Sequence, residues 1–164
     1  MRFTVEQRFS TGADETARAF ADPDLYAGFA ALPKVSVPDV LSCERDGDLV
    51  ELRIRYRFAG HLSSAARAVI DPAQLTWVDE STHDLARRHV RFVLRPDHHG
   101  NRFRCSGGYR IEPDGDGCRR HATIDLKVSA PLVGRAVERA IESGLREHLA
   151  DETEVVEAYL AARR

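Results

Sequence analysis

The sequence contains few cysteines, and they are not placed for a shared site. The 164 residues include Cys43, Cys105 and Cys118, an odd number without Cys-x-x-Cys spacing. This argues against both a disulfide framework and a zinc site. The seven histidines show no recurrent metal-ligand spacing either. We therefore expect reduced cysteines, no metal and no cofactor.

Long apolar runs and an excess of positive charge are also missing. No hydrophobic run approaches the roughly 20 residues of a membrane span, and the first ten residues lack the apolar core of a secretory signal. The expectation is a cytoplasmic protein without integral membrane association. The formal net charge is -2, which gives no reason to expect a nucleic acid partner. All the basic residues except two are arginine, a skew that we attribute to a GC-rich coding sequence.

Residues 2 to 9 alternate between apolar and polar side chains, the period of a strand with one buried face. Two short helices are predicted to follow this strand. Thr11 can cap the first helix, with Asp14 at its third position as in a capping box. Asp22 followed by Pro23 begins the second helix, which we expect to be about ten residues long.

From residue 35 onward the apolar period is two for about ninety residues, which predicts an antiparallel sheet. The clearest strand, LVELRIRYRF, alternates apolar and charged side chains, and Asp46-Gly47-Asp48 marks a hairpin turn before it. Gly107 and Gly108 interrupt a later strand, and we interpret the pair as a bulge, with a widened pocket as the alternative. Further strands are expected over residues 75–83, 89–95, 102–112 and 118–128.

Segment 59 to 74 is the one long connection between predicted strands, and it can hold a short helix near Ser64 to Val69. Two interpretations are open. Long connections often form lids or binding loops, in which case His61 and Leu62 would border an entrance. Otherwise the segment is a plain crossover at the end of the sheet.

Pro131 stands where a helix begins, and residues 132 to 162 contain no proline, which predicts a helix of about 30 residues. Its single apolar stripe needs a partner surface, and the inner face of the sheet is the only large apolar surface left. The helix is therefore expected to lie across the sheet. No repeat or low-complexity linker divides the chain, and its length favours one domain over residues 1–164.

The order of these elements resembles the helix-grip fold of the START, polyketide-cyclase and birch-pollen-allergen superfamily. The likeness covers essentially the whole chain and rests on stretches such as FTVEQRFSTGADETARAFADPDLYAGF, GDLVELRIRYRF and APLVGRAVERAIESGLREHL. It looks most like an actinobacterial branch of that superfamily. The resemblance implies an α+β fold, in which a curved antiparallel sheet of six or seven strands wraps around the last helix. It also implies a cavity between the two for a lipid, polyketide or other apolar molecule, and it transfers no catalytic residue.

Two ionisable side chains, His148 and Glu152, interrupt the apolar stripe of the last helix. At 100° per residue they share a face with Ile141 and Leu145. If the helix covers a cavity, the pair can point into it, with His148 supplying the partner that a buried carboxylate needs. Alternatively, the helix overhangs the sheet there and both groups are solvated. Gly144 on the same side either lets a ligand approach the helix or lets the sheet pack closely.

Aromatic side chains occupy the inward positions of the predicted strands, where they would line either a packed core or an apolar pocket. Together with the helix residues above they form the candidate ligand-binding set. These strand residues are Tyr56, Phe58, Trp77, Phe92, Phe103 and Tyr109.

Three functions fit these patterns. The first is a module that binds or carries a small apolar or amphipathic molecule, with His148 and Glu152 as its polar handle. The second is an enzyme of the cyclase, dehydratase or hydrolase kind, in which His148 acts as a general acid or base oriented by Glu152. The third is a protein-interaction module with a filled, dry core. The space under the last helix distinguishes them.

Overall fold

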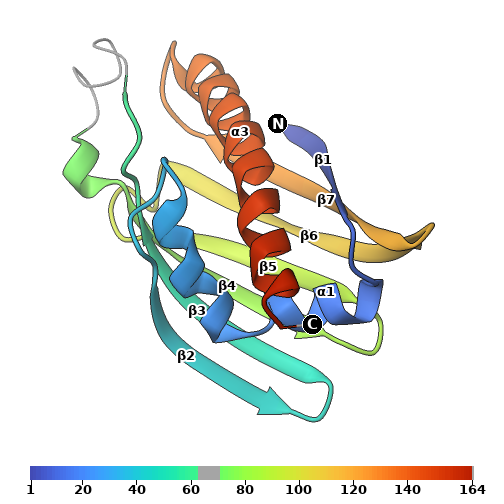
Figure 1. Ribbon diagram of the computed structural model, residues 1–164. Helices are drawn as coiled ribbons and strands as arrows, with labels where there is room; N and C mark the ends of the chain where they lie inside the picture. The colour runs from blue at the N-terminus through green and yellow to red at the C-terminus, as the bar shows by residue number, and fades with distance from the viewer. Residues whose placement is uncertain (63–70, 164) are drawn as a thin grey trace.

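A computed structural model describes residues 1–62 and 71–163 of the chain. Seven strands form one antiparallel sheet, and the long helix α3 (Gly134–Ala161) crosses the face of the sheet that curves toward it (Figure 1). The predicted α+β helix-grip fold is confirmed, because the strand run, the two short helices after the first strand and the terminal helix are all present. No helix in the described part of the chain is long and apolar enough to cross a membrane.

The sheet has the order β1-β7-β6-β5-β4-β3-β2, and neighbouring strands are antiparallel throughout. Strands β2 to β7 follow one another as a meander, and β1 pairs with β7. This arrangement brings the first and last strands together beneath the N-terminal half of α3 (Figure 1). The bounds are β1 Arg2–Phe9, β2 Asp39–Asp46, β3 Leu49–Arg57, β4 Thr76–Asp84, β5 His89–Pro96, β6 Phe103–Asp114 and β7 Gly117–Val128.

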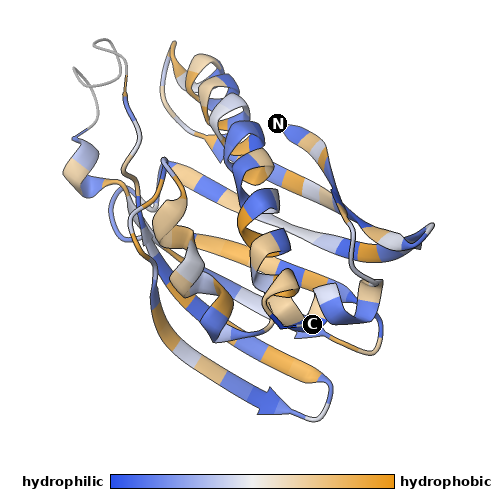
Figure 2. Ribbon diagram, viewed as in Figure 1, coloured by the Kyte–Doolittle hydropathy of each residue, from blue (hydrophilic) through white to orange (hydrophobic). Residues whose placement is uncertain are grey.

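Strand β3 shows how the two-residue period builds the sheet. Val50, Leu52 and Ile54 are buried on the side that faces the helices, and the charged residues between them are exposed. Hydrophobic and hydrophilic residues also follow one another along other strands (Figure 2), most regularly in β7, where Ala122, Ile124 and Leu126 are buried. The predicted hairpin before β3 is present, and Gly47 in its turn has a φ of 59°, which glycine adopts without strain.

Two short helices follow β1, as predicted. These are α1 (Ala13–Phe20) and the 3₁₀ helix η1 (Pro23–Ala31), and they flank the C-terminal half of α3 (Figure 1). The carboxylate of Asp22 caps η1 by accepting a hydrogen bond from the Asp24 backbone N–H at 2.9 Å. The predicted cap of α1 is wrong, because the helix begins after Gly12 instead of Thr11. A shorter 3₁₀ helix, η2 (Pro72–Gln74), precedes β4.

The long connection between β3 and β4 is only partly described. The short helix predicted near Ser64 to Val69 lies outside the described residues. His61 is exposed and Leu62 is partly buried, and neither belongs to a helix or strand.

The apolar core divides into two clusters along α3. In the first, the Ile141 cluster, Ile141 and Leu145 of the helix pack on buried strand residues that include Phe3, Ile124 and Leu126. The second, the Val156 cluster, joins Val156 and Leu160 of the helix to α1, η1 and β3. The stretch of α3 between the clusters carries His148 and Glu152. The two ionisable groups therefore lie between apolar contacts on both sides.

The glycine pair of β6 does not form the predicted bulge. Strand pairing is continuous on both sides, and Gly107 lies opposite Phe92 on β5 and Ile124 on β7. A Cβ atom on Gly107 would lie 2.3 Å from the carbonyl oxygen of Thr123 and 2.8 Å from the Phe92 ring. Glycine is therefore required because the neighbouring backbone and the aromatic ring occupy the space of a side chain.

Replacing Gly107 by alanine is expected to lower the free energy of unfolding by about 1–3 kcal/mol, the usual cost of overpacking. Gly144→Ala is the matched control, since a Cβ atom there meets nothing within 4 Å. Alanine should stabilise the helix at that position by about 0.8–1 kcal/mol. Urea denaturation measures both changes. Equal effects of the two substitutions would contradict the close approach at Gly107.

Candidate functional site

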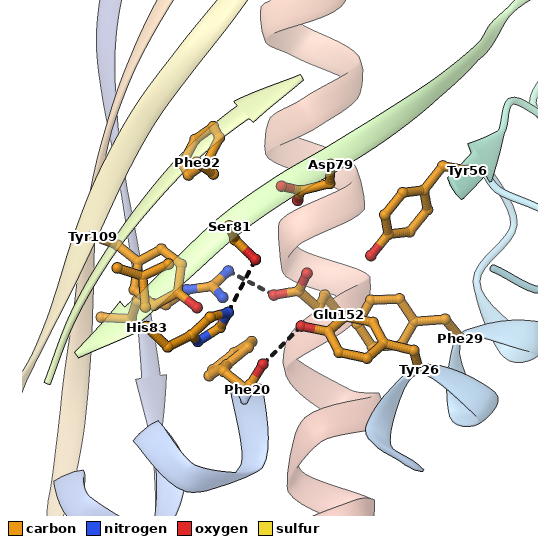
Figure 3. Close-up of a pocket in the computed structure, with 12 residues that line it drawn as sticks. Phe20, Tyr26, Phe29, Tyr56, Asp79, Ser81, His83, Phe92, Tyr109 and Glu152 are labelled. Carbon is orange, nitrogen blue, oxygen red and sulfur yellow. Dashed lines mark hydrogen bonds and ion pairs between the residues drawn. The ribbon is translucent and has the colours of Figure 1, made fainter. Parts of the chain in front are cut away.

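A cavity of about 70 Å³ lies between the sheet and α3. Its wall combines aromatic rings with polar side chains that point into one space (Figure 3). The rings belong to Phe20, Tyr26, Phe29, Tyr56, Phe92 and Tyr109. The polar side chains are those of Asp79, Ser81, His83, Arg120 and Glu152.

Strand β4 supplies most of the polar wall. Asp79, Ser81 and His83 alternate along it, so all three face the helix side of the sheet. Their partners on β3 are apolar, with Ile54 opposite Asp79 and Val50 opposite His83. The inward face of the sheet is thus apolar on β3 and polar on the adjacent strand β4.

Arg120 on β7 and Glu152 on α3 form a buried ion pair, with 2.6 Å between Nη2 and Oε1. Their side chains are only 5% and 9% exposed. The guanidinium carbon of Arg120 also lies 4.2 Å from the Phe20 ring centroid and 4.8 Å from that of Tyr109. Gln7 on β1 donates a longer hydrogen bond of 3.4 Å to the same carboxylate oxygen. Glu152 is therefore held from two strands at once.

This arrangement corrects the predicted pairing of His148 with Glu152. Arg120 occupies the position of the partner, and no hydrogen bond or ion pair joins the two helix residues in the described structure. His148 is partly buried on the helix and does not line the cavity, and its Nδ1 atom has no partner among the described residues. Burial is the main reason why the pKa of His148 is lowered.

Asp79 is the most perturbed acid of the cavity. Its pKa is raised from 3.8 to about 7, first because burial disfavours the charged form and then because Glu152 and Glu80 are negative. The residue lines the cavity and is partly exposed, but its Oδ1 atom is covered and has no hydrogen-bond partner within residues 1–62 and 71–163. At neutral pH this carboxyl is divided between its protonated and ionised forms.

His83 is the most deeply buried polar residue of the wall, at 1% exposure. Its Nε2 atom lies 3.0 Å from the hydroxyl oxygen of Ser81, whereas Nδ1 has no partner in the described part of the chain. Burial and the positive charge of Arg120 lower the pKa of His83 from 6.5 to about 4, so the ring is neutral at pH 7.

Three residues of the wall therefore carry a covered polar atom that is unpaired within the described structure: Oδ1 of Asp79, Nδ1 of His83 and Nε of Arg120. Leaving such an atom unpaired costs about 1–3 kcal/mol. A molecule that offers hydrogen bonds inside the cavity would remove this cost.

Several of the predicted binding residues meet at this cavity. Tyr56, Phe92, Tyr109 and Glu152 line it. Trp77 does not, although its ring stacks on Tyr56 with centroids 5.7 Å apart. These aromatic positions follow directly from the alternation of the strands.

The other predicted binding residues lie elsewhere. Phe103, Ile141 and Leu145 pack in the Ile141 cluster. Phe58 follows β3 and forms an isolated bridge with Val35. A Cβ atom added to Gly144 would meet no other atom within 4 Å, so the sheet does not pack closely against the helix there. Gly144 does not line the cavity either.

Sequence reasoning missed Asp79, Ser81, His83 and Arg120. On β4 the adjacent apolar residues Trp77 and Val78 point to opposite faces, so their pattern does not fix which face is inward. The available signal was Glu80, which pairs with the outward arginines Arg53 and Arg95 at 3.5 and 3.1 Å. An outward Glu80 places its neighbours Asp79 and Ser81 inward.

A second hollow of about 230 Å³ lies near the start of β2. Its lining is mostly polar and includes Asp39, Arg55 and Arg57. Tyr56 lines both this hollow and the cavity under α3. Tyr56 therefore borders both spaces.

Comparison with known proteins finds a family and a set of related folds. A family model described as "Protein of unknown function (DUF2505)" matches residues 4–160. No curated protein matches the sequence. The structure of TTHA0849, a protein from Thermus thermophilus, is 18% identical with a TM-score of 0.69, and the match covers 99% of each chain.

Two enzymes have the same fold. The Zhui aromatase/cyclase from Streptomyces sp. R1128 is 16% identical with a TM-score of 0.66, covering 99% of this chain and 94% of the enzyme. Norcoclaurine synthase from Thalictrum flavum is 15% identical with a TM-score of 0.63, covering 98% and 86%. At these identities the likeness establishes the fold alone.

Arg120→Met is expected to lower the free energy of unfolding by about 3–5 kcal/mol, because Glu152 is left buried without its cation. Adding Glu152→Gln should recover part of the loss, since the uncompensated charge is gone. The exposed pair Arg2–Asp125, at 3.3 Å, is the control, and Arg2→Met should cost no more than about 1 kcal/mol. Chemical denaturation of the four proteins measures these differences, and similar losses for Arg2→Met and Arg120→Met would contradict the buried pair.

Asp79→Asn is expected to match the wild-type free energy of unfolding near pH 4 and to exceed it at pH 8. The folded-state pKa, about 7, lies above the usual 3.8, so wild type loses stability as the pH rises between these values. Asparagine has no charge to bury. The lowered pKa of His83 reduces the stability of the protein as the pH falls below 6.5. Because His83 is present in both proteins, this effect cancels when their free energies of unfolding are compared. A difference independent of pH in denaturation curves would contradict the raised pKa.

Proposed function

The chain belongs to the DUF2505 family of proteins of unknown function, and we propose that it binds a small amphipathic molecule in the cavity between the sheet and α3. One observation carries this proposal. The aromatic cavity is lined by the polar side chains of Asp79, His83 and Arg120, and each of these carries a covered polar atom that has no partner within the described residues. A ligand with an apolar body and hydrogen-bonding groups would complement both parts of this wall.

The energetics of such a site follow from its two kinds of surface. Burial of the apolar part of a ligand contributes about 25 cal/mol per Å². The polar atoms contribute less net affinity, but they fix the orientation of the ligand and reject molecules that leave them unpaired. The Ile141 and Val156 clusters close the core on both sides of the cavity, so the polar wall is confined to the ligand site.

The volume limits what the cavity holds. An apolar cavity of about 150 Å³ binds benzene, so 70 Å³ accommodates only a few non-hydrogen atoms. We assign this space to the polar end of the ligand. A longer molecule would extend toward the mostly polar hollow of about 230 Å³, which Tyr56 also lines.

The two other functions have less support. The enzyme hypothesis required His148 beside Glu152 in the cavity, but His148 does not line it and Arg120 holds the carboxylate. The interaction-module hypothesis required a filled, dry core between the helix and the sheet. The structure has a cavity lined by polar groups there instead. The fold is shared with the aromatase/cyclase Zhui, which supports a small-molecule ligand for this chain.

Filling the cavity tests the proposal. Ser81→Leu places an apolar side chain in the cavity, and the matched control Thr82→Leu places the same group on the exposed face of β4. We expect the neutral probe 1-propanol to bind wild type and Thr82→Leu saturably, and to bind Ser81→Leu at least about tenfold more weakly, which corresponds to about 1.4 kcal/mol.

Ligand-detected NMR titration at pH 7 measures this binding. Circular dichroism and thermal melting of each variant establish that it is folded. Absence of saturable binding by wild type, or equal loss in both variants, would overturn the proposal and leave only water as the occupant of the cavity.

A further inference from the structure

We infer that the polar group bound in the cavity is a small organic cation, a primary ammonium, whose charge is held by the carboxylate of Asp79. This inference rests on the proposed function, and it names the class of ligand that the site accepts. It follows from the balance of charges in the wall, from the groups around Asp79 and from the aromatic rings.

The charges of the wall do not cancel. Arg120 and Glu152 neutralise each other in the ion pair of 2.6 Å. His83 is neutral at pH 7, because burial and Arg120 hold its pKa near 4. Ionised Asp79 is then one uncompensated negative charge in the cavity. A monocation restores neutrality, whereas an anionic ligand would meet the carboxylate of Asp79 and an arginine already paired.

The surroundings of Asp79 favour a cation over an anion. The charges that act most strongly on this carboxyl, those of Glu152 and Glu80, are both negative. Asp79 lines the cavity and is partly exposed, and its covered Oδ1 atom has no partner among the described residues. The carboxyl can reduce the cost of its burial by taking up a proton or by pairing with a cation, and an ammonium N–H can donate to this carboxylate.

The aromatic wall complements the same charge. Ring faces attract cations by about 0.5–2 kcal/mol or more when the cation is desolvated. Several rings border this space, among them Tyr26, Tyr56 and Phe92 (Figure 3). The tyrosine hydroxyls stay neutral, since burial raises the pKa of Tyr26 and Tyr56 well above the ordinary value. A carboxylate ringed by aromatic side chains recognises an ammonium group on an apolar stem.

Binding of such a cation must compete with a proton for Asp79. With a pKa of about 7, the ionised fraction of Asp79 rises from about one tenth at pH 6 to about nine tenths at pH 8. Affinity for an alkylammonium ion, which stays protonated in this range, should therefore rise about tenfold between these values.

The titratable or charged groups that face this space are Glu152 of α3, Arg120 of β7, His83 of β4, Tyr56 of β3, Tyr109 of β6 and Tyr26 of η1, with Glu80 next in the chain.

The experiment compares three probes of similar size: propylammonium, 1-propanol and propionate. NMR titrations at pH 6 and pH 8, at constant ionic strength, give their affinities for wild type. We expect propylammonium to bind about tenfold more tightly at pH 8 than at pH 6, and more tightly than 1-propanol at pH 8. Propionate should bind most weakly.

Asp79→Asn should remove both the preference for propylammonium over 1-propanol and its pH dependence. The control Asp125→Asn removes a carboxylate from the exposed face of β7 and should change neither. Urea denaturation verifies that both variants fold.

The results separate this inference from the proposed function. If Ser81→Leu weakens the binding of 1-propanol but wild type shows no preference for propylammonium, the inference of a cationic ligand is wrong and the proposed ligand site is retained. Tighter binding of propionate would also overturn the cation. If none of the probes binds wild type, both proposals fail.

Discussion

The buried ion pair between Arg120 and Glu152 determines the character of the core. It joins the last strand to the middle of α3, at a place where apolar contacts would otherwise continue from the Ile141 cluster to the Val156 cluster. Two charges taken out of water need excellent geometry and further favourable contacts. The rings of Phe20 and Tyr109 supply cation–π contacts to Arg120, and the amide of Gln7 donates a hydrogen bond to Glu152. Once this pair is buried, the neighbouring wall has to be polar as well.

The pair also sets the electrostatics of the cavity. Because Arg120 is committed to Glu152, its positive charge does not balance Asp79, and it lowers the pKa of His83. The carboxyl of Asp79 is left in a buried place with negative neighbours, and its pKa moves into the physiological range. The same sheet-and-helix frame carries an aromatase/cyclase and norcoclaurine synthase, so side chains such as these, not the fold, decide what each cavity accepts.

Part of the candidate site could be predicted from the sequence. The alternation of β3 identifies Tyr56 as inward, and the helical period identifies Glu152 as part of the stripe on α3. The remaining polar wall could not be read in the same way. The apolar residues of β4 are adjacent, so its inward face is set by pairing with β3, and the partner of Glu152 comes from a strand 32 residues earlier in the chain. Helical spacing instead favoured His148 as the partner of Glu152. A sequence shows which residues are neighbours on one helix, but it does not show which residues of a strand and a helix come into contact.

The sequence by itself determined the order of strands and helices, the inward face of most strands and the need for α3 to cover the sheet, since these follow from side-chain periods of two and 3.6 residues. Only the tertiary structure decided that Gly107 makes room for a ring, that Gly144 faces open space, and that charged groups from β4, β7 and α3 meet in one small cavity. Periodicity assigns a side chain to a face. The distance between two faces, and hence the pairing and the pKa of the groups between them, depends on how the layers pack.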